Sequence, residues 1–213
     1  VKLANEHGVH LFELIFWRQT ITLPIVLTVM WLTGTLANLR TYRLDAPFRR
    51  AMLGVTGMCF VYGAVILLPL AEATTISFTA PFFAVMLSVL LFREKVGLVL
   101  WSAVLLGFAG ITIAMQPGGG SEAISLTGVA VGLIAAFLVA LISYQLQDLN
   151  RTESPQAIVA WFTAMTIPIA ALSLPFVATA HDGQTWLVIG AMAVCGAVGQ
   201  LLLTASLRYG HAA

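Results

Sequence analysis

The feature that most constrains this chain is a succession of long apolar runs, each about as long as a membrane is thick. A bilayer core of roughly 30 Å needs about 20 apolar residues in a helix. The runs are continuous rather than alternating, which favours helices over the strands of a membrane barrel. Reading them between polar breaks predicts an all-α integral membrane protein with seven spans, at 11–34, 50–70, 72–92, 97–116, 126–148, 156–179 and 184–206.

Composition argues against the other classes of protein. Only 9% of the 213 residues are charged and 60% are hydrophobic, whereas soluble domains are about 25% charged. A net charge of +1 without a basic cluster argues against nucleic-acid binding. Cys59 and Cys195 lie in apolar runs and the four His residues lack metal-ligand spacing, so we expect no disulfide, metal or cofactor.

The basic residues indicate an orientation. Eight of the ten Lys and Arg residues fall in alternate loops and the C-terminal tail, while the loops around Gly118 and His181 contain neither. Because basic loops stay in the cytoplasm, four segments are expected there in a multi-pass protein of the bacterial inner membrane. These segments are 35–50, 93–96, 147–155 and 207–213.

The chain resembles itself at long range. Residues 16–25 align with residues 160–169, with coincident Trp, Thr, Pro and Ile, and residues 67–72 align loosely with residues 204–209. The first pair of segments enters the membrane from opposite sides, so the two copies have opposite topology. Inverted repeats of this kind are the architecture of many secondary transporters.

The repeat also predicts the domain organisation. A first repeat is expected at 1–116 and a second at 125–213, joined by a loop at 117–124. Each repeat is expected to contain five spans when complete. In this sequence the first repeat lacks most of its first helix, and the second repeat lacks its last two helices. We therefore expect an inverted-repeat helix bundle with seven full spans and the cut ends of a ten-span fold.

Three sequence segments resemble one known family. They are PLAEATTISFTAPFF at 69–83, LFREKV at 91–96 and GFAGI at 107–111. They look like the EamA family of the drug/metabolite transporter superfamily, which consists of ten-helix secondary carriers. The resemblance runs from the end of the family's first helix to the start of its ninth, and it implies transport of small metabolites without indicating which one.

Arg18 is the leading candidate site residue because it lies about 10 Å into a span, where a charge is costly. It should face a cavity, a partner carboxylate or water, although snorkelling to the interface is the alternative. The family resemblance supports a role, since an Arg recurs at this point of the second helix. Glu72, at the outer end of a junction, would bind a cation or proton, pair with Arg18, or be a solvated turn residue. Glu13 is interpreted as an interfacial residue.

The other candidates are polar or aromatic residues inside spans. Each is explained either by packing between helices or by a substrate path, and both readings stay open. Pro81 should kink its helix, and the glycine pairs Gly128/Gly132 and Gly107/Gly110 are expected to be close-packing surfaces. The remaining candidates are Trp17, Tyr62, Tyr144, Gln145, Trp161 and Gln200.

The interpretation is a membrane secondary transporter working by alternating access between the two repeats. An inactive or structural fragment, or a membrane-embedded enzyme, are the alternatives, but no paired carboxylates, His cluster or Ser/His set supports an enzyme. The expected partners are the lipid bilayer and a small-molecule substrate. A coupling proton or counter-substrate and a homodimer are further candidates.

Overall fold

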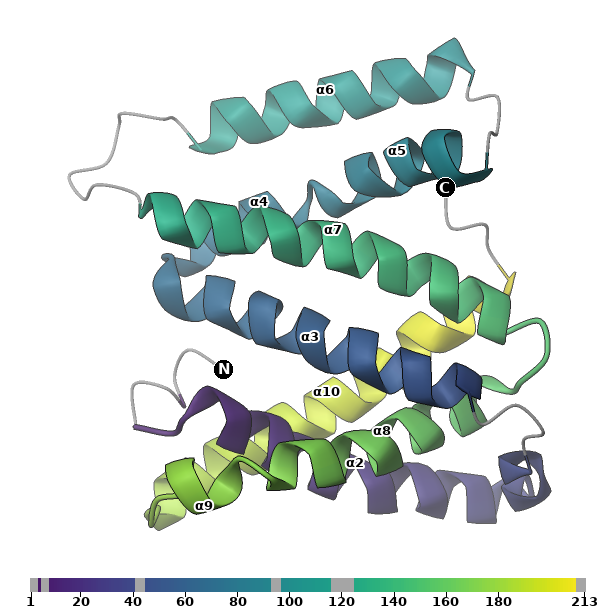
Figure 1. The fold of residues 1–213 in the computed structure, drawn as a ribbon, viewed down its shortest axis with the longest axis vertical. Coiled ribbons are helices and arrows are strands. Elements are labelled where there is room, and N and C mark those ends of the chain that lie inside the picture. The colour runs from purple at the N-terminus through teal and green to yellow at the C-terminus, as the bar shows by residue number, and fades with distance from the viewer. Residues whose placement is uncertain (1–3, 5–7, 41–44, 93–96, 116–124, 210–213) are drawn as a thin grey trace. The chain divides into compact units, whose positions relative to one another are not determined.

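The computed structural model describes residues 4, 8–40, 45–92, 97–115 and 125–209. Within these residues the chain forms helices and no strand, which confirms the all-α class. The helices are α2 (Leu11–Leu32), η1 (Leu36–Leu39), α3 (Asp45–Leu67), α4 (Leu70–Ser77), α5 (Ala80–Phe92), α6 (Leu98–Met115), α7 (Leu126–Leu149), α8 (Pro155–Ala171), α9 (Leu174–Val177) and α10 (Gly183–Tyr209) (Figure 1). Five stretches of the described chain are long and apolar enough to cross a membrane, namely α2, α3, Leu70–Leu90, α7 and Gly183–Ser206.

The predicted span 72–92 is broken rather than kinked. Helix α4 ends at Ser77 and α5 begins at Ala80, so Pro81 is the second residue of a new helix. Proline is tolerated in a first turn, where its missing N–H has no intrahelical partner to lose. At the break, the Thr79 hydroxyl donates to the Ile76 carbonyl at 2.7 Å. The expectation of a kink at Pro81 within a continuous helix was therefore wrong.

Two other predicted boundaries shift. Helix α3 starts at Asp45 rather than near residue 50, and an ion pair of 3.1 Å between Arg49 and Asp45 spans its first turn. The predicted span 156–179 is a 17-residue helix, α8, followed by the separate short helix α9. Ser154 caps α8 by accepting a hydrogen bond from the Ala157 amide at 3.3 Å.

The chain divides into two compact units. Unit 1 comprises Val1–Cys59 and Gln145–His211, and unit 2 comprises Phe60–Tyr144 with Ala212–Ala213. Each unit therefore draws on both predicted repeats. The connecting loop expected at 117–124 and the basic loop at 93–96 lie outside the described residues, as do residues 41–44 and 210–213.

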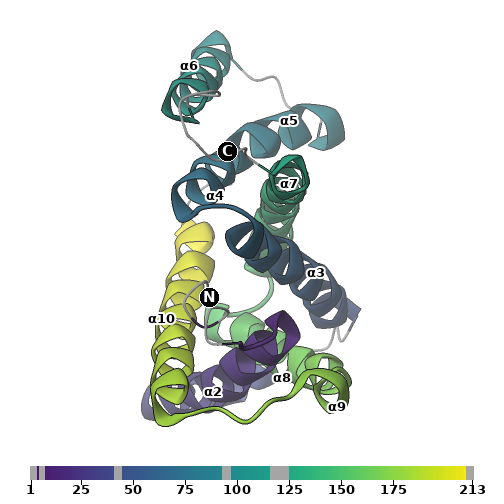
Figure 2. The ribbon, with the colours of Figure 1, turned by 90° about the vertical axis from the view of Figure 1, so that its left-hand side faces the viewer.

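Unit 1 is built on α2, α8 and α10. Helix α2 packs against both α8 and α10, and α8 also contacts α10 (Figures 1 and 2). Val26 and Met30 of α2 are buried against Val159 and Ala160 of α8. Burial of aliphatic side chains between these helices gives the unit its core.

Unit 2 is held by close helix contacts. A Cβ at Gly128 would lie 2.7 Å from Leu68, and one at Gly132 would lie 3.0 Å from Ile76, so this pair forms a close-packing surface as expected. Gly107 and Gly110 have no neighbour within 4 Å among the described residues, so the structure does not support the same expectation there.

Candidate functional site

Arg18 is half-buried in unit 1, where α2, α3 and α10 supply its neighbours. It is seven residues into α2, about 10 Å along the helix axis. Its Nη1 donates to Met58 Sδ of α3 at 3.6 Å, and its Nη2 donates to the Gly196 carbonyl at 3.4 Å and to Gln200 Oε1 at 3.3 Å. The guanidinium is thus turned into the unit by side-chain and backbone acceptors, not toward a carboxylate.

Gly196 makes this position of Arg18 sterically possible. A Cβ at residue 196 would lie 2.5 Å from Arg18 Nε and 3.1 Å from its Cζ. The absence of a side chain on this turn of α10 therefore lets the guanidinium reach the helix backbone. Next to Arg18, Gln19 is fully buried and its Nε2 lies 4.0 Å from Met58 Sδ.

Arg50 is another arginine of the same unit, and it is buried more deeply than Arg18. Its side chain is 5% exposed and lies over the ring of Phe162 of α8, with 4.2 Å between Cζ and the ring centroid. Its Nε and Nη1 have no hydrogen-bond partner among the described residues. Arg50 was expected at the end of a basic loop, but α3 begins five residues earlier, so Arg50 is a helical residue.

The two guanidinium groups carry uncompensated charge. Among the described residues, neither Arg18 nor Arg50 lies within ion-pair distance of a carboxylate. Ionised groups buried in a protein are normally paired, because removing a charge from water is costly. Arg18 and Arg50 are also near enough for their like charges to repel each other.

A carboxylate is buried elsewhere in unit 1. Glu13 Oε1 lies 2.8 Å from His181 Nε2, and the two side chains are 2% and 3% exposed. The Trp17 indole donates to the same oxygen at 3.3 Å and packs edge-on against Trp186, with centroids 4.7 Å apart. Glu13 is therefore enclosed by protein side chains, because the chain before α10 returns to cover it.

The structure brings together only some of the predicted site residues. Arg18 donates a hydrogen bond to Gln200. Trp17, the residue before Arg18, instead donates to Glu13. Trp161 donates to the Leu39 carbonyl at 3.0 Å, a contact that ties α8 to η1. Gln145 belongs to the same unit, and its buried Oε1 has no partner among the described residues.

The other four candidates belong to unit 2. Tyr144 donates from its hydroxyl to the Ala84 carbonyl at 2.7 Å, a helix–helix contact of the expected kind. Tyr62 is buried, and Pro81 is exposed at the start of α5. Glu72 is half-buried in α4, and its buried Oε2 has no partner among the described residues. Arg18 belongs to the other unit and hydrogen-bonds there to Gly196 and Gln200.

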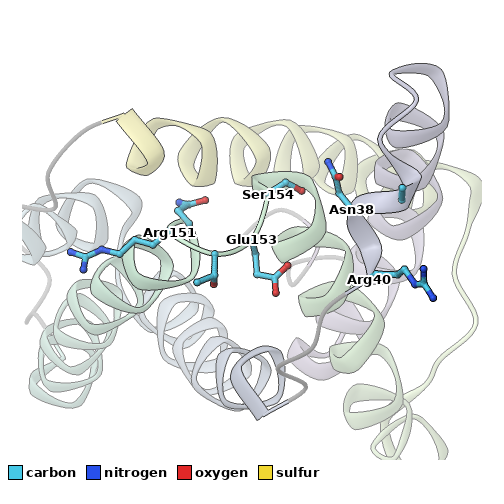
Figure 3. A pocket seen from close by; sticks show the side chains of 8 residues that line it. Asn38, Arg40, Arg151, Glu153 and Ser154 are labelled. Atoms are coloured by element: carbon cyan, nitrogen blue, oxygen red, sulfur yellow. The ribbon is translucent and has the colours of Figure 1, made fainter.

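A polar hollow of about 360 Å³ opens on the surface of unit 1, between η1 and the connection from α7 to α8. Figure 3 shows the Arg40 and Arg151 side chains pointing away from one another at its two ends, with Glu153 between them. The hollow is lined by Ala37, Asn38, Arg40, Asn150, Arg151, Thr152, Glu153 and Ser154. Within the described part of the chain, no group of three or more His, Cys, Asp or Glu residues could hold a metal ion.

Three residues of this region were not predicted as site residues: Arg50, Glu13 and His181. For Arg50 a signal was present, since Asp45 and Arg49 have the spacing of a helical ion pair and place the helix start before residue 50. For Glu13 and His181, which are 168 residues apart in the chain, no local pattern points to the contact.

These features define a class of protein: an apolar, all-helical, multi-pass membrane bundle with buried charged groups in its interior. Within that class, the EamA-like transporter family model matches residues 1–116, and the chain belongs to that family. The resemblance of the three sequence segments is thereby confirmed.

Several curated relatives are transporters by name. The chain is 28% identical to a riboflavin transporter of Vibrio cholerae, with 86% of the chain and 61% of the relative covered. It is 27% identical to a riboflavin transporter of Brucella anthropi, with 95% and 72% covered. It is 26% identical to an S-adenosylmethionine uptake transporter of Rickettsia felis, with 91% and 64% covered. The chain thus spans 61–72% of the length of these relatives.

A solved structure shares the fold. It is described only as the crystal structure of a protein, and it matches with a TM-score of 0.71 at 22% identity over 96% of this chain and 72% of the other. At this identity the likeness concerns the fold alone.

Proposed function

We propose that the protein is a secondary transporter that moves a small metabolite across the bacterial inner membrane by alternating access between two inverted repeats. The basic segments 35–50, 93–96, 147–155 and 207–213 then face the cytoplasm. Transport is coupled to a proton or a counter-substrate.

The position of Arg18 carries the proposal. A charge at this depth of a span costs about 2.5–3.5 kcal/mol on insertion scales, so a residue that merely faced lipid would be a liability. Arg18 is instead turned inward and held by acceptors of α3 and α10. Charged groups that face the interior of a membrane bundle mark substrate or ion pathways.

The paired helices α2 and α8 support the repeat. Each contains an internal proline thirteen residues after its first residue, Pro24 in α2 (24 − 11) and Pro168 in α8 (168 − 155). Interrupted helices in corresponding positions of two halves are typical of transporter binding regions. The two helices also pack directly against each other.

The names of the relatives suggest the first cargoes to test. Two cargoes are tested side by side, since relatives carry both names: S-adenosylmethionine, which has a carboxylate, and riboflavin, which has neither a carboxylate nor a phosphate. The assay is uptake of labelled cargo by the full-length protein, expressed in bacteria and then reconstituted in proteoliposomes.

Arg18 variants test the site. Arg18→Leu should insert normally, because it removes a costly charge from the membrane, yet lose transport. Arg18→Lys should retain partial activity, since it keeps the charge and loses the planar fork that grips two oxygens. Thr28→Leu, at an exposed position of the same helix, is the matched control and should transport normally. Wild-type transport by Arg18→Leu would refute the proposed site.

A further inference from the structure

We propose that Arg18 and Arg50 together bind the negatively charged group of the cargo, so that the transported molecule carries a carboxylate or a phosphate. This inference rests on the proposed transport function and specifies its substrate class. It extends the site from Arg18 of α2 to Arg50 of α3, whose guanidinium group is covered by Phe162 of α8.

The surroundings of Arg50 have the features of a built site. Its guanidinium face is occupied by the Phe162 ring, whereas Nε and Nη1 are buried without a partner among the described residues. Gly54 provides the space, since a Cβ there would overlap both Arg50 Nη1 and the Phe162 ring. The side chain is thus fixed by packing, and two of its three nitrogen atoms remain available to an acceptor.

The direction of the Arg50 side chain argues against snorkelling. Residue 50 lies about 7.5 Å from the start of α3, so the nearer membrane surface is at the Asp45 end. A snorkelling side chain would point back toward that end. Instead, Nη1 reaches the position of Gly54, one turn further into the helix.

Arg18 contacts the same stretch of α3. It donates to Met58, one turn beyond Gly54, so the positions at which the two guanidinium groups meet α3 lie about 6 Å apart along the helix axis. Their like charges repel, and Glu13, a buried carboxylate of the same unit, is already paired with His181. An anion between the arginines would relieve the repulsion and supply acceptors to the unpartnered nitrogen atoms of Arg50.

The guanidinium group narrows the ligand chemistry. Its planar fork matches the spacing of carboxylate and phosphate oxygens and binds them with charge-assisted hydrogen bonds. A neutral cargo would leave both charges uncompensated. Carboxylate and phosphate are therefore the expected recognition groups, in a free anion or in a zwitterion.

The test uses the purified full-length protein in detergent and two pairs of probes that differ in the anionic group. The pairs are nicotinate with nicotinamide and glycerol 3-phosphate with glycerol, at constant ionic strength. The unfolding temperature is measured for the wild type, Arg50→Gln, Arg50→Lys and the control Arg49→Gln. Arg49 is exposed and pairs with Asp45, so it matches Arg50 in charge but not in burial. The same measurement is repeated with phosphatidylglycerol as the probe, which distinguishes binding of a lipid headgroup from binding of a soluble anion.

At least one anionic probe should raise the wild-type unfolding temperature by about 5 °C at a hundredfold excess over its Kd, and its neutral counterpart should not. Arg50→Gln should lose the anion effect. Arg50→Lys, which keeps the charge, should retain a reduced effect even if Arg50→Gln fails to fold, and Arg49→Gln should keep the full effect.

Three results would overturn the anion site: no rise with any soluble anion, an equal rise in Arg50→Gln, or a rise with phosphatidylglycerol alone. Uptake assays with the same probes separate this inference from the proposed function. An anion-dependent rise without transport of any cargo would refute transport and leave the anion site standing. Transport of neutral cargo only, unchanged in Arg50→Gln, would refute the anion site and leave transport standing.

Discussion

Arg50 of α3 and Phe162 of α8 both pack against the backbone of Gly54. The variant Gly54→Ala tests whether this packing stabilises unit 1. An added Cβ would overlap both the Arg50 guanidinium and the Phe162 ring. Phe162 is 2% exposed and Arg50 is 5% exposed, so both side chains are enclosed by the protein. One methyl group should therefore separate the pair.

The magnitude follows from three contributions. Overpacking a filled core costs about 1–3 kcal/mol. Loss of a desolvated cation–π contact costs about 2 kcal/mol, and replacing a helical glycine by alanine returns up to about 1 kcal/mol. The net destabilisation is about 2–4 kcal/mol, which corresponds to a fall in unfolding temperature of roughly 5–15 °C.

The assay is thermal unfolding of the detergent-solubilised protein, followed by tryptophan fluorescence. Gly199→Ala is the matched control, since residue 199 lies in α10 and its added Cβ would meet no described atom of another helix within 4 Å. That variant should be as stable as the wild type or slightly more stable. The double variant Gly54→Ala/Phe162→Leu should regain part of the lost unfolding temperature, because it removes the ring atoms that the added methyl group would overlap. If Gly54→Ala is as stable as Gly199→Ala, the packing described for Arg50 is wrong.

Two further predictions concern the buried carboxylate and the orientation. His181→Ala should lower the free energy of unfolding by about 1–3 kcal/mol, because it leaves Glu13 buried with only the Trp17 indole as partner, and adding Glu13→Leu should recover part of that loss in thermal unfolding. An undiminished unfolding temperature in His181→Ala would contradict the pairing. Single cysteines at residues 45 and 119 should react with a membrane-impermeant maleimide from opposite sides of the membrane, and labelling of both from one side would contradict the orientation.

Much of the fold was predictable because membrane insertion is governed by local hydropathy. Runs of about 20 apolar residues can satisfy their backbone groups only as helices in lipid, so the run lengths predict where helices occur. The unexpected boundaries arose where local backbone chemistry competes with hydropathy. The Asp45–Arg49 pair extends α3 toward its N-terminus, and the break before Pro81 divides an otherwise apolar run.

The candidate site was predictable only in part. Arg18 and Gln200 were both recognised as polar groups inside spans, since such groups are costly in lipid wherever they face. Their mutual hydrogen bond was not recognised, because they are 182 residues apart in the chain. The burial of Arg50 was not predicted, because a charge near a predicted span boundary is usually assigned to the loop.

By itself, the sequence determined the class of protein, the approximate helices, the family and the presence of a charge inside the first predicted span, 11–34. Those properties depend on composition, period and short motifs, which are local. Only the tertiary structure decided that Arg18 reaches α10 through the gap at Gly196, that Arg50 is enclosed by Phe162, and that Glu13 meets His181. The physical reason is that the cost of a buried charge depends on which groups packing brings within about 4 Å of it, and those groups come from helices distant in the chain.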